Sequence, residues 1–120
     1  MEKNRRILIV EDDIIQSLAM KLMLEELGYE ICDCVVSGEE ALDGVERDLP
    51  DLVLMDINIL GAFDGIDVAE KIIEQFRIPV IMMSGGDNQY DRARGIGVAG
   101  YFIKPVEMNS LRLTIESLLR

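Results

Sequence analysis

The stretch DLVLMDINI, residues 51–59, places a carboxylate directly after a run of apolar residues. Leu52 to Met55 are apolar without a polar alternate, which is typical of a strand buried on both faces. An unpaired carboxylate beside a dry core is strongly unfavourable. Asp56 therefore either caps a loop or has a charged partner and a chemical task.

Similar apolar runs recur along the chain and alternate with helical spacing. Strands are predicted at ILIV (7–10), YEICDCVV (29–36), DLVLM (51–55), PVIMM (79–83) and AGYFI (99–103). A helix is predicted over 14–27, with its buried stripe on Ile15, Leu18 and Leu22 and with Gly28 as its C-terminal cap. Further helices are predicted after a capping box at Ser37 and Glu40, after Asp64, within 87–95, and through Val106, Leu111, Ile115 and Leu118.

Five strands alternating with five helices predict an α/β fold. Right-handed crossovers favour a flavodoxin-like (βα)5 three-layer sandwich, with a parallel five-stranded sheet of order 2-1-3-4-5. The 120 residues suit a single domain, 1–120, and no output domain is visible. Ligands of such folds bind beyond the carboxyl ends of the strands.

Composition excludes several classes of function. The net charge of −11 disfavours direct binding of nucleic acid, and no apolar run is long enough to span a membrane. The absence of histidine excludes imidazole acid–base chemistry and imidazole zinc sites. Cys32 and Cys34 are two residues apart on one predicted strand, so their side chains are expected on the same face and poorly placed to form a disulfide. Both are therefore predicted to be reduced thiols, as is usual in a cytoplasmic protein.

Polar groups of complementary kinds follow four of the predicted strands. Glu11, Asp12 and Asp13 come after the first, Asp56 and Asn58 after the third, Ser84 after the fourth, and Lys104 and Pro105 after the fifth. These groups are expected to meet at one rim of the sheet, so Asp56 should lie at the rim and not inside it.

Crowded carboxylates need a compensating charge, and hard oxygen ligands select Mg²⁺, with Mn²⁺ or Ca²⁺ as substitutes. Lys104 adds a positive charge and Ser84 adds a hydroxyl that can bond a phosphoryl oxygen. The set predicts phosphoryl transfer, in which the Asp56 carboxylate attacks phosphorus and forms a labile acyl phosphate.

The chain resembles the receiver domain of two-component response regulators, similar to the chemotaxis regulators, over essentially its whole length. The resemblance is carried by ILIVEDD, LVLMDINI, FDGIDVAEKI, VIMMSG and GYFIKP, in that order. It implies that Asp56 is the phosphoacceptor and that Glu11 and Asp12 form the acidic pair, with Asp12 as the direct Mg²⁺ ligand.

The resemblance also implies roles for the surrounding residues. Asn58 would lend its backbone carbonyl to Mg²⁺, and its side chain and Gly86 would tune the lifetime of the phosphoryl group. Lys104 would contact the phosphoryl group, Ser84 and Tyr101 would be the switch pair, and Pro105 would follow a cis bond. Asp13 is interpreted as a helix N-cap, with a metal role as the alternative.

The family resemblance implies a switch in which the face of the fourth helix, fifth strand and fifth helix is remodelled. The chain departs from the family pattern in the loop from Asp56 to Asp64, which is one residue longer and has Gly61 where proline is frequent. It also has Ser84 where threonine is more frequent.

The expected partner is a histidine kinase or a histidine phosphotransfer protein, with Ile15 as a candidate docking residue. The downstream target or fused output domain is left open. Alternatives are a degenerate receiver acting without phosphorylation, a haloacid-dehalogenase-like phosphatase and a flavin carrier. The phosphatase needs an acid where Asn58 stands, and the flavin carrier needs a phosphate loop where the acids stand.

Overall fold

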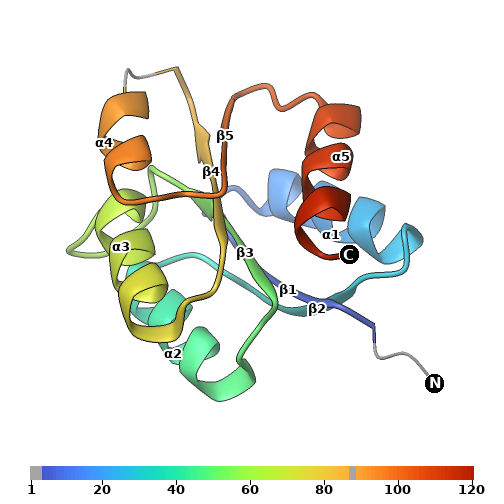
Figure 1. Ribbon diagram of the computed structural model, residues 1–120, viewed down its shortest axis with the longest axis horizontal. Coiled ribbons are helices and arrows are strands. Elements are labelled where there is room, and N and C mark those ends of the chain that lie inside the picture. Colours follow the sequence, from blue (N-terminus) through green and yellow to red (C-terminus); the bar gives the residue numbers. More distant parts are fainter. Residues whose placement is uncertain (1–3, 87–88) are drawn as a thin grey trace.

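Five parallel strands form one central sheet with helices on both faces (Figure 1). This computed structural model describes residues 4–86 and 89–120. The strands are β1 (Arg6–Val10), β2 (Glu30–Val35), β3 (Leu52–Asp56), β4 (Val80–Ser84) and β5 (Gly100–Ile103). Their order is β2-β1-β3-β4-β5, as predicted.

The helices alternate with the strands along the chain. They are α1 (Ile14–Glu26), α2 (Gly38–Asp48), α3 (Gly65–Phe76), α4 (Tyr90–Gly95) and α5 (Met108–Leu118). The helix predicted within 87–95 therefore begins at Tyr90, and residues 87 and 88 lie outside the described residues.

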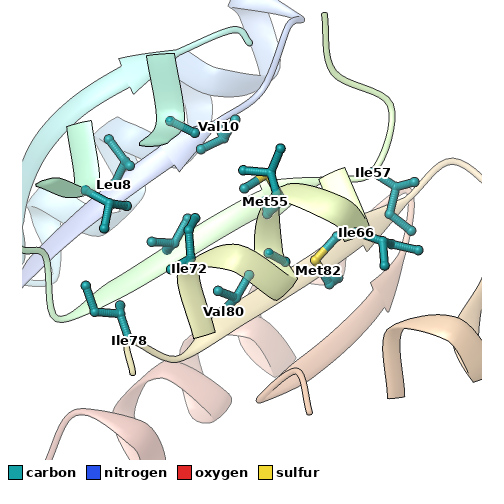
Figure 2. Close-up of a cluster of buried hydrophobic side chains, with 14 of the residues drawn as sticks. Leu8, Val10, Met55, Ile57, Ile66, Ile72, Ile78, Val80 and Met82 are labelled. Carbon is teal, nitrogen blue, oxygen red and sulfur yellow. The ribbon is translucent and has the colours of Figure 1, made fainter. Parts of the chain in front are cut away.

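The core lies on both faces of the sheet because successive strand residues point in opposite directions. Leu8 and Val10 of β1 face α2 and α3, in the cluster drawn in Figure 2. Ile7 and Ile9 face Met20 and Leu24 of α1, in a cluster that also includes Leu111 and Ile115 of α5. Two-sided burial explains why the buried residues 7–10, 52–55 and 80–83 of β1, β3 and β4 are apolar without a polar alternate.

The predicted buried stripe of α1 is wrong. Ile15 is 80% exposed and Leu22 is 56% exposed, and the buried residues are Ser17, Met20 and Leu24. The observed face is offset by two residues, which is about 200° around the helix. The helix has apolar residues on two opposite sides, and the polar Ser17 concealed the side that packs on the sheet.

Side chains predicted to cap helices do so. Ser37 accepts from the N–H of Glu40, and the Glu40 carboxylate accepts from the N–H of Val36 in return. Asp64 caps α3 by accepting from the N–H of Asp67. Gly28 follows α1 with φ +98°, a left-handed conformation that favours glycine.

The two cysteines do not follow the simple alternation predicted for β2. The register between β1 and β2 shifts, with Ile7 opposite Ile31 and Leu8 opposite Asp33, so Cys32 is an extra residue in the strand. Ile31 and Cys34 consequently pack against the same cluster. Both cysteines are free thiols.

Among the described residues, no helix is long and apolar enough to cross a membrane.

Candidate functional site

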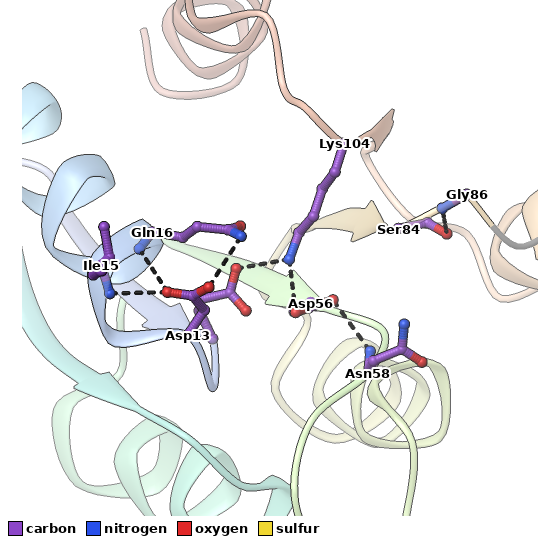
Figure 3. Close-up of polar contacts among 9 residues, drawn as sticks. Asp13, Ile15, Gln16, Asp56, Asn58, Ser84, Gly86 and Lys104 are labelled. Atoms are coloured by element: carbon purple, nitrogen blue, oxygen red, sulfur yellow. Dashed lines mark hydrogen bonds and ion pairs between the residues drawn. The ribbon is translucent and has the colours of Figure 1, made fainter.

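The ends of four structural elements bring the predicted polar residues together at one rim of the sheet (Figure 3). Asp56 and Ser84 are the last residues of β3 and β4, and Glu11 and Lys104 directly follow β1 and β5. Asp56 lies at the rim, as predicted, but it is only 3% exposed and is therefore buried.

Lys104 joins two buried carboxylates. Its Nζ donates to Glu11 Oε1 at 2.8 Å and to Asp56 Oδ2 at 2.9 Å. Glu11 is 1% exposed, and its other oxygen, Oε2, has no hydrogen-bond partner among the described residues. A buried carboxylate oxygen without a donor is costly, so this atom marks a place where a further positive group fits.

The acidic cluster has the composition of a site for a hard divalent cation. One oxygen from each of Glu11, Asp12 and Asp56 lies within 4.8 Å of the others. Three carboxylates and one ammonium leave a formal charge of −2, which a single divalent cation balances. Oxygen donors of this kind suit Mg²⁺, which retains several waters and needs few protein ligands.

The protonation behaviour of the cluster reflects this unbalanced charge. Burial, followed by the adjacent Asp56 carboxylate, raises the pKa of Glu11 to about 7, and Lys104 offsets this only in part. Burial would lower the pKa of Lys104, but its hydrogen bonds to Glu11 and Asp56 outweigh burial and raise that pKa. The ammonium therefore stays charged in contact with Asp56.

Asp13 lies outside the acidic cluster. Its carboxylate accepts from the N–H groups of Ile15 at 2.9 Å and Gln16 at 3.2 Å, so it caps α1 as predicted. The Gln16 amide also donates to it. Among the described residues, the carboxylates close enough to share an ion are those of Glu11, Asp12 and Asp56, without Asp13. The alternative metal-binding role of Asp13 therefore has no support there.

Backbone contacts fix the loop that begins at Asp56. The Asn58 N–H donates to Asp56 Oδ1 at 3.1 Å, which holds the carboxylate on the side opposite Lys104. Farther along, Leu60 pairs with Ser37 in a parallel bridge, and its N–H donates to the carbonyl of Val36 at 3.1 Å. Gly61, at φ +110°, lies against the Glu39 carboxylate, so the unusual loop is tied to the start of α2.

Gly65 allows α3 to begin next to the backbone of Asp56. Its N–H donates to the carbonyl of Ile57 at 2.8 Å. A Cβ at Gly65 would overlap the Asp56 carbonyl oxygen and would lie 2.8 Å from Ile57 Cα. The sequence prediction did not assign a role to Gly65, although its position directly after a helix N-cap was visible.

The residues predicted to form the switch lie on β4 and β5. Ser84 is fully buried, and the Gly86 N–H donates to its Oγ at 3.4 Å. Tyr101 is partly buried on β5 and makes an edge-to-face contact with Tyr90 of α4, with ring centroids 5.4 Å apart. The Lys104–Pro105 bond is cis, as the resemblance implied.

Comparison with known families shows to which family the chain belongs. Residues 7–116 match the model of the response regulator receiver domain. The chain belongs to this receiver family. The match begins within β1, includes the other four strands and reaches into α5, so the acidic cluster, Ser84 and Lys104 all lie within the matched part of the receiver.

Curated relatives of the receiver include two transcriptional regulators. PdtaR of Mycobacterium tuberculosis is 35% identical over 114 residues, covering 93% of this chain and 55% of the relative. PhoP of Bacillus subtilis is 30% identical over 120 residues, covering 98% of this chain and 49% of the relative. The receiver thus spans about half the length of the curated relatives it matches.

Solved structures share the fold of this receiver. The signal receiver domain of a modulated diguanylate cyclase from Desulfovibrio desulfuricans aligns with TM-score 0.90 at 30% identity, covering 98% of this chain and 94% of that one. A CheY-like receiver protein from Methanospirillum hungatei aligns with TM-score 0.88 at 29% identity, covering 97% and 94%.

Receivers of this family bind Mg²⁺ at an acidic pocket and interact with histidine kinases, and they are regulators and not dedicated enzymes. The cluster of Glu11, Asp12 and Asp56 gives this receiver the ligand chemistry of that pocket.

Proposed function

We propose that this receiver accepts a phosphoryl group on Asp56 from a phosphohistidine donor, in the presence of Mg²⁺, and signals through a change of α4, β5 and α5. The observation that supports this most directly is the contact at 2.9 Å between Lys104 Nζ and the buried Asp56 carboxylate, within an acidic cluster of formal charge −2.

The transfer is balanced without any further reactant. An Asp56 oxygen attacks phosphorus, the bond from phosphorus to the imidazole nitrogen of the donor breaks, and its electron pair returns to the imidazole. Hydrolysis of the acyl phosphate then regenerates the carboxylate and releases inorganic phosphate. The step needs positive charge near the transferring oxygens, which Lys104 supplies from the protein side.

The surrounding residues have matching roles in this proposal. Glu11, Asp12, Asp56 and the backbone carbonyl of Asn58 would hold Mg²⁺, which supplies charge neutralisation during transfer. Ser84 and Tyr101 would report the phosphoryl group to α4. The side chain of Asn58 and Gly86 would set access of water and therefore the lifetime of the acyl phosphate.

The partners follow from this chemistry. The donor is a histidine kinase or a histidine phosphotransfer protein, because the chain itself has no histidine. We place the protein in the cytoplasm, where its two free thiols remain reduced. One relative is named as a transcriptional regulatory protein and another as a modulated diguanylate cyclase. Receivers of this kind therefore occur with different outputs, and we assign no particular output to this one.

Phosphotransfer from a labelled phosphohistidine protein tests the proposal. The expected result is one phosphoryl group on the wild type, dependent on Mg²⁺, and none on Asp56→Asn. Equal labelling of the variant, or turnover of phosphate esters without a labelled protein, would contradict it. The second result would favour a phosphatase.

A further inference from the structure

Helix α4 is too short to be stable without tertiary contacts. It spans six residues, Tyr90–Gly95, and no side chain caps its first turn. Isolated helices of this length do not persist in water. The position of α4 is therefore set by the few side chains that join it to the rest of the fold.

Among the described residues, such contacts come from Tyr90, Arg92 and Ala93 of α4. Ala93 is fully buried in the cluster shared with α2 and α3. Tyr90 packs edge-on against Tyr101 of β5. Arg92 reaches in the other direction, to the start of α3, which lies beside α4 in Figure 1.

The Arg92 guanidinium contacts two carboxylates at the start of α3, those of the N-cap Asp64 and of Asp67 in the first turn. Its Nη1 donates to Asp64 Oδ2 at 2.8 Å, and its Nη2 donates to Asp67 Oδ1 at 2.9 Å. A second contact from Nη2 to Asp64 Oδ1 measures 3.4 Å. A planar guanidinium with several donors fits such a pair of acceptors better than an ammonium does.

The far end of this contact lies next to the phosphoacceptor. Asp64 is the N-cap of α3, and the next residue, Gly65, is packed against the backbone of Asp56. The ion pairs therefore fasten α4 to the same short segment that supports Asp56. Any motion of α4 away from α3 must break them.

We propose that Arg92 is a clamp that holds α4 against the start of α3 in the unphosphorylated protein and thereby opposes activation. This inference rests on the proposed function. The proposal assigns the ion pairs of Arg92 to the resting state and their loss to the activated state. An interaction made in one of two states shifts the equilibrium toward that state.

The charges support an intact clamp at neutral pH. Burial opposes ionisation of Asp64, but hydrogen bonds from Arg92 and from the Asp67 N–H outweigh it and lower the pKa of Asp64. Hydrogen bonding to Asp64 likewise raises the pKa of Arg92. Both partners are partly exposed, so each ion pair contributes modestly.

The test compares two variants of α4 that lose the same charge. Arg92→Gln removes the clamp, and Arg94→Gln is the control, because Arg94 makes no ion pair among the described residues. Beryllofluoride with Mg²⁺ serves as the phosphoryl analogue. By linkage, loss of two exposed ion pairs made in the resting state should tighten binding of the analogue about threefold to tenfold.

A second readout does not need the analogue. In Mg²⁺-free buffer, amide hydrogen exchange over residues 90–95 should accelerate about threefold to tenfold in Arg92→Gln and stay near wild type in Arg94→Gln. Asp67→Asn, which leaves the Asp64 cap in place, should give part of the effect. Its effect should not add to that of Arg92→Gln, because the two residues share one interaction.

The two measurements distinguish failure of the Arg92 clamp from failure of the proposed phosphorylation of Asp56. Equal analogue affinity and equal exchange in both arginine variants would overturn the clamp, and so would weaker analogue binding by Arg92→Gln. If the wild type binds no beryllofluoride, the proposed function fails, while the exchange measurement still decides whether Arg92 holds α4.

Discussion

Lys104 Nζ lies 2.9 Å from the Asp56 carboxylate, although the two residues are 48 positions apart in the chain. The parallel sheet produces this contact, because β3 and β5 both end at the same rim on either side of β4. The ammonium compensates the charges of two buried carboxylates, those of Glu11 and Asp56, at once.

Replacement of Lys104 by methionine should destabilise the protein in Mg²⁺-free buffer by about 3 kcal/mol, because Glu11 and Asp56 lose their shared positive partner. Added Mg²⁺ should recover part of this loss, and the recovery should exceed the gain that Mg²⁺ gives the wild type. Urea unfolding with and without MgCl2 measures both values. The same loss at every Mg²⁺ concentration would argue against a cation at the acidic cluster.

Asp56→Asn should have the opposite effect on stability. It removes one of the crowded carboxylates, so the free energy of unfolding in Mg²⁺-free buffer should rise by about 1 kcal/mol. Stabilisation by Mg²⁺ should become weaker at the same time. Calorimetry with a Mg²⁺ titration checks both effects, and an undiminished response to Mg²⁺ would exclude Asp56 as part of the cation site.

Gly65→Ala should be severely destabilising, by about 3 kcal/mol or more, because the new Cβ overlaps the backbone of Asp56 and cannot be relieved by a side-chain rotation. Gly95→Ala is the matched control, since a Cβ there meets no atom within 4 Å. It should change stability by less than about 1 kcal/mol. Comparable losses in the two variants, measured by denaturant unfolding, would contradict the close approach at Gly65.

The two faces of α1 should respond differently to truncation. Leu24→Ala should cost about 2–5 kcal/mol because Leu24 is fully buried, whereas Leu22→Ala should cost less than about 1 kcal/mol. Equilibrium unfolding of both variants measures the contrast. A larger loss for Leu22 than for Leu24 would restore the face predicted from the sequence.

Asp64 should contribute to stability only where it is ionised. Its pKa is lowered in the folded protein, so the contribution is complete above the unfolded value, near 4, and is lost as the pH falls through the folded value. Asp64→Asn keeps an acceptor for the cap but removes the charge. The variant should be less stable than the wild type by about 0.5–1 kcal/mol at pH 7.

The difference between Asp64→Asn and the wild type should shrink toward zero as the pH falls below about 4. Unfolding curves at pH 7 and at successively lower pH provide the comparison. A difference that is constant across this range would mean that the charge of Asp64 contributes nothing to folding.

The rim could be predicted from sequence because each of its residues directly follows an apolar run, and the topology fixes where those runs end. Asp56, Glu11 and Lys104 illustrate this. The capping residues Asp13, Ser37 and Asp64 were also predictable, since a cap bonds to backbone groups within a few positions.

Three features that depend on tertiary packing were not predictable from the sequence: the buried face of α1, the register of β2 and the ion pair of Arg92. Helix α1 has two apolar sides, and only packing on the sheet selects the one with Met20 and Leu24. The extra residue Cys32 in β2 arises from pairing with β1, which leaves no local signal. The pairing of Arg92 with Asp64 joins residues 28 positions apart, so no periodicity indicates it.

Identification of the phosphorylated residue decides whether Asp56 is the phosphoacceptor. The wild type is incubated with an acyl phosphate donor and Mg²⁺, reduced with borohydride, which converts an aspartyl phosphate to homoserine, and mapped by peptide mass spectrometry. We expect homoserine at position 56, and none there when Mg²⁺ is chelated. Modification of another residue, or none at any Mg²⁺ concentration, would contradict Asp56 as the phosphoacceptor.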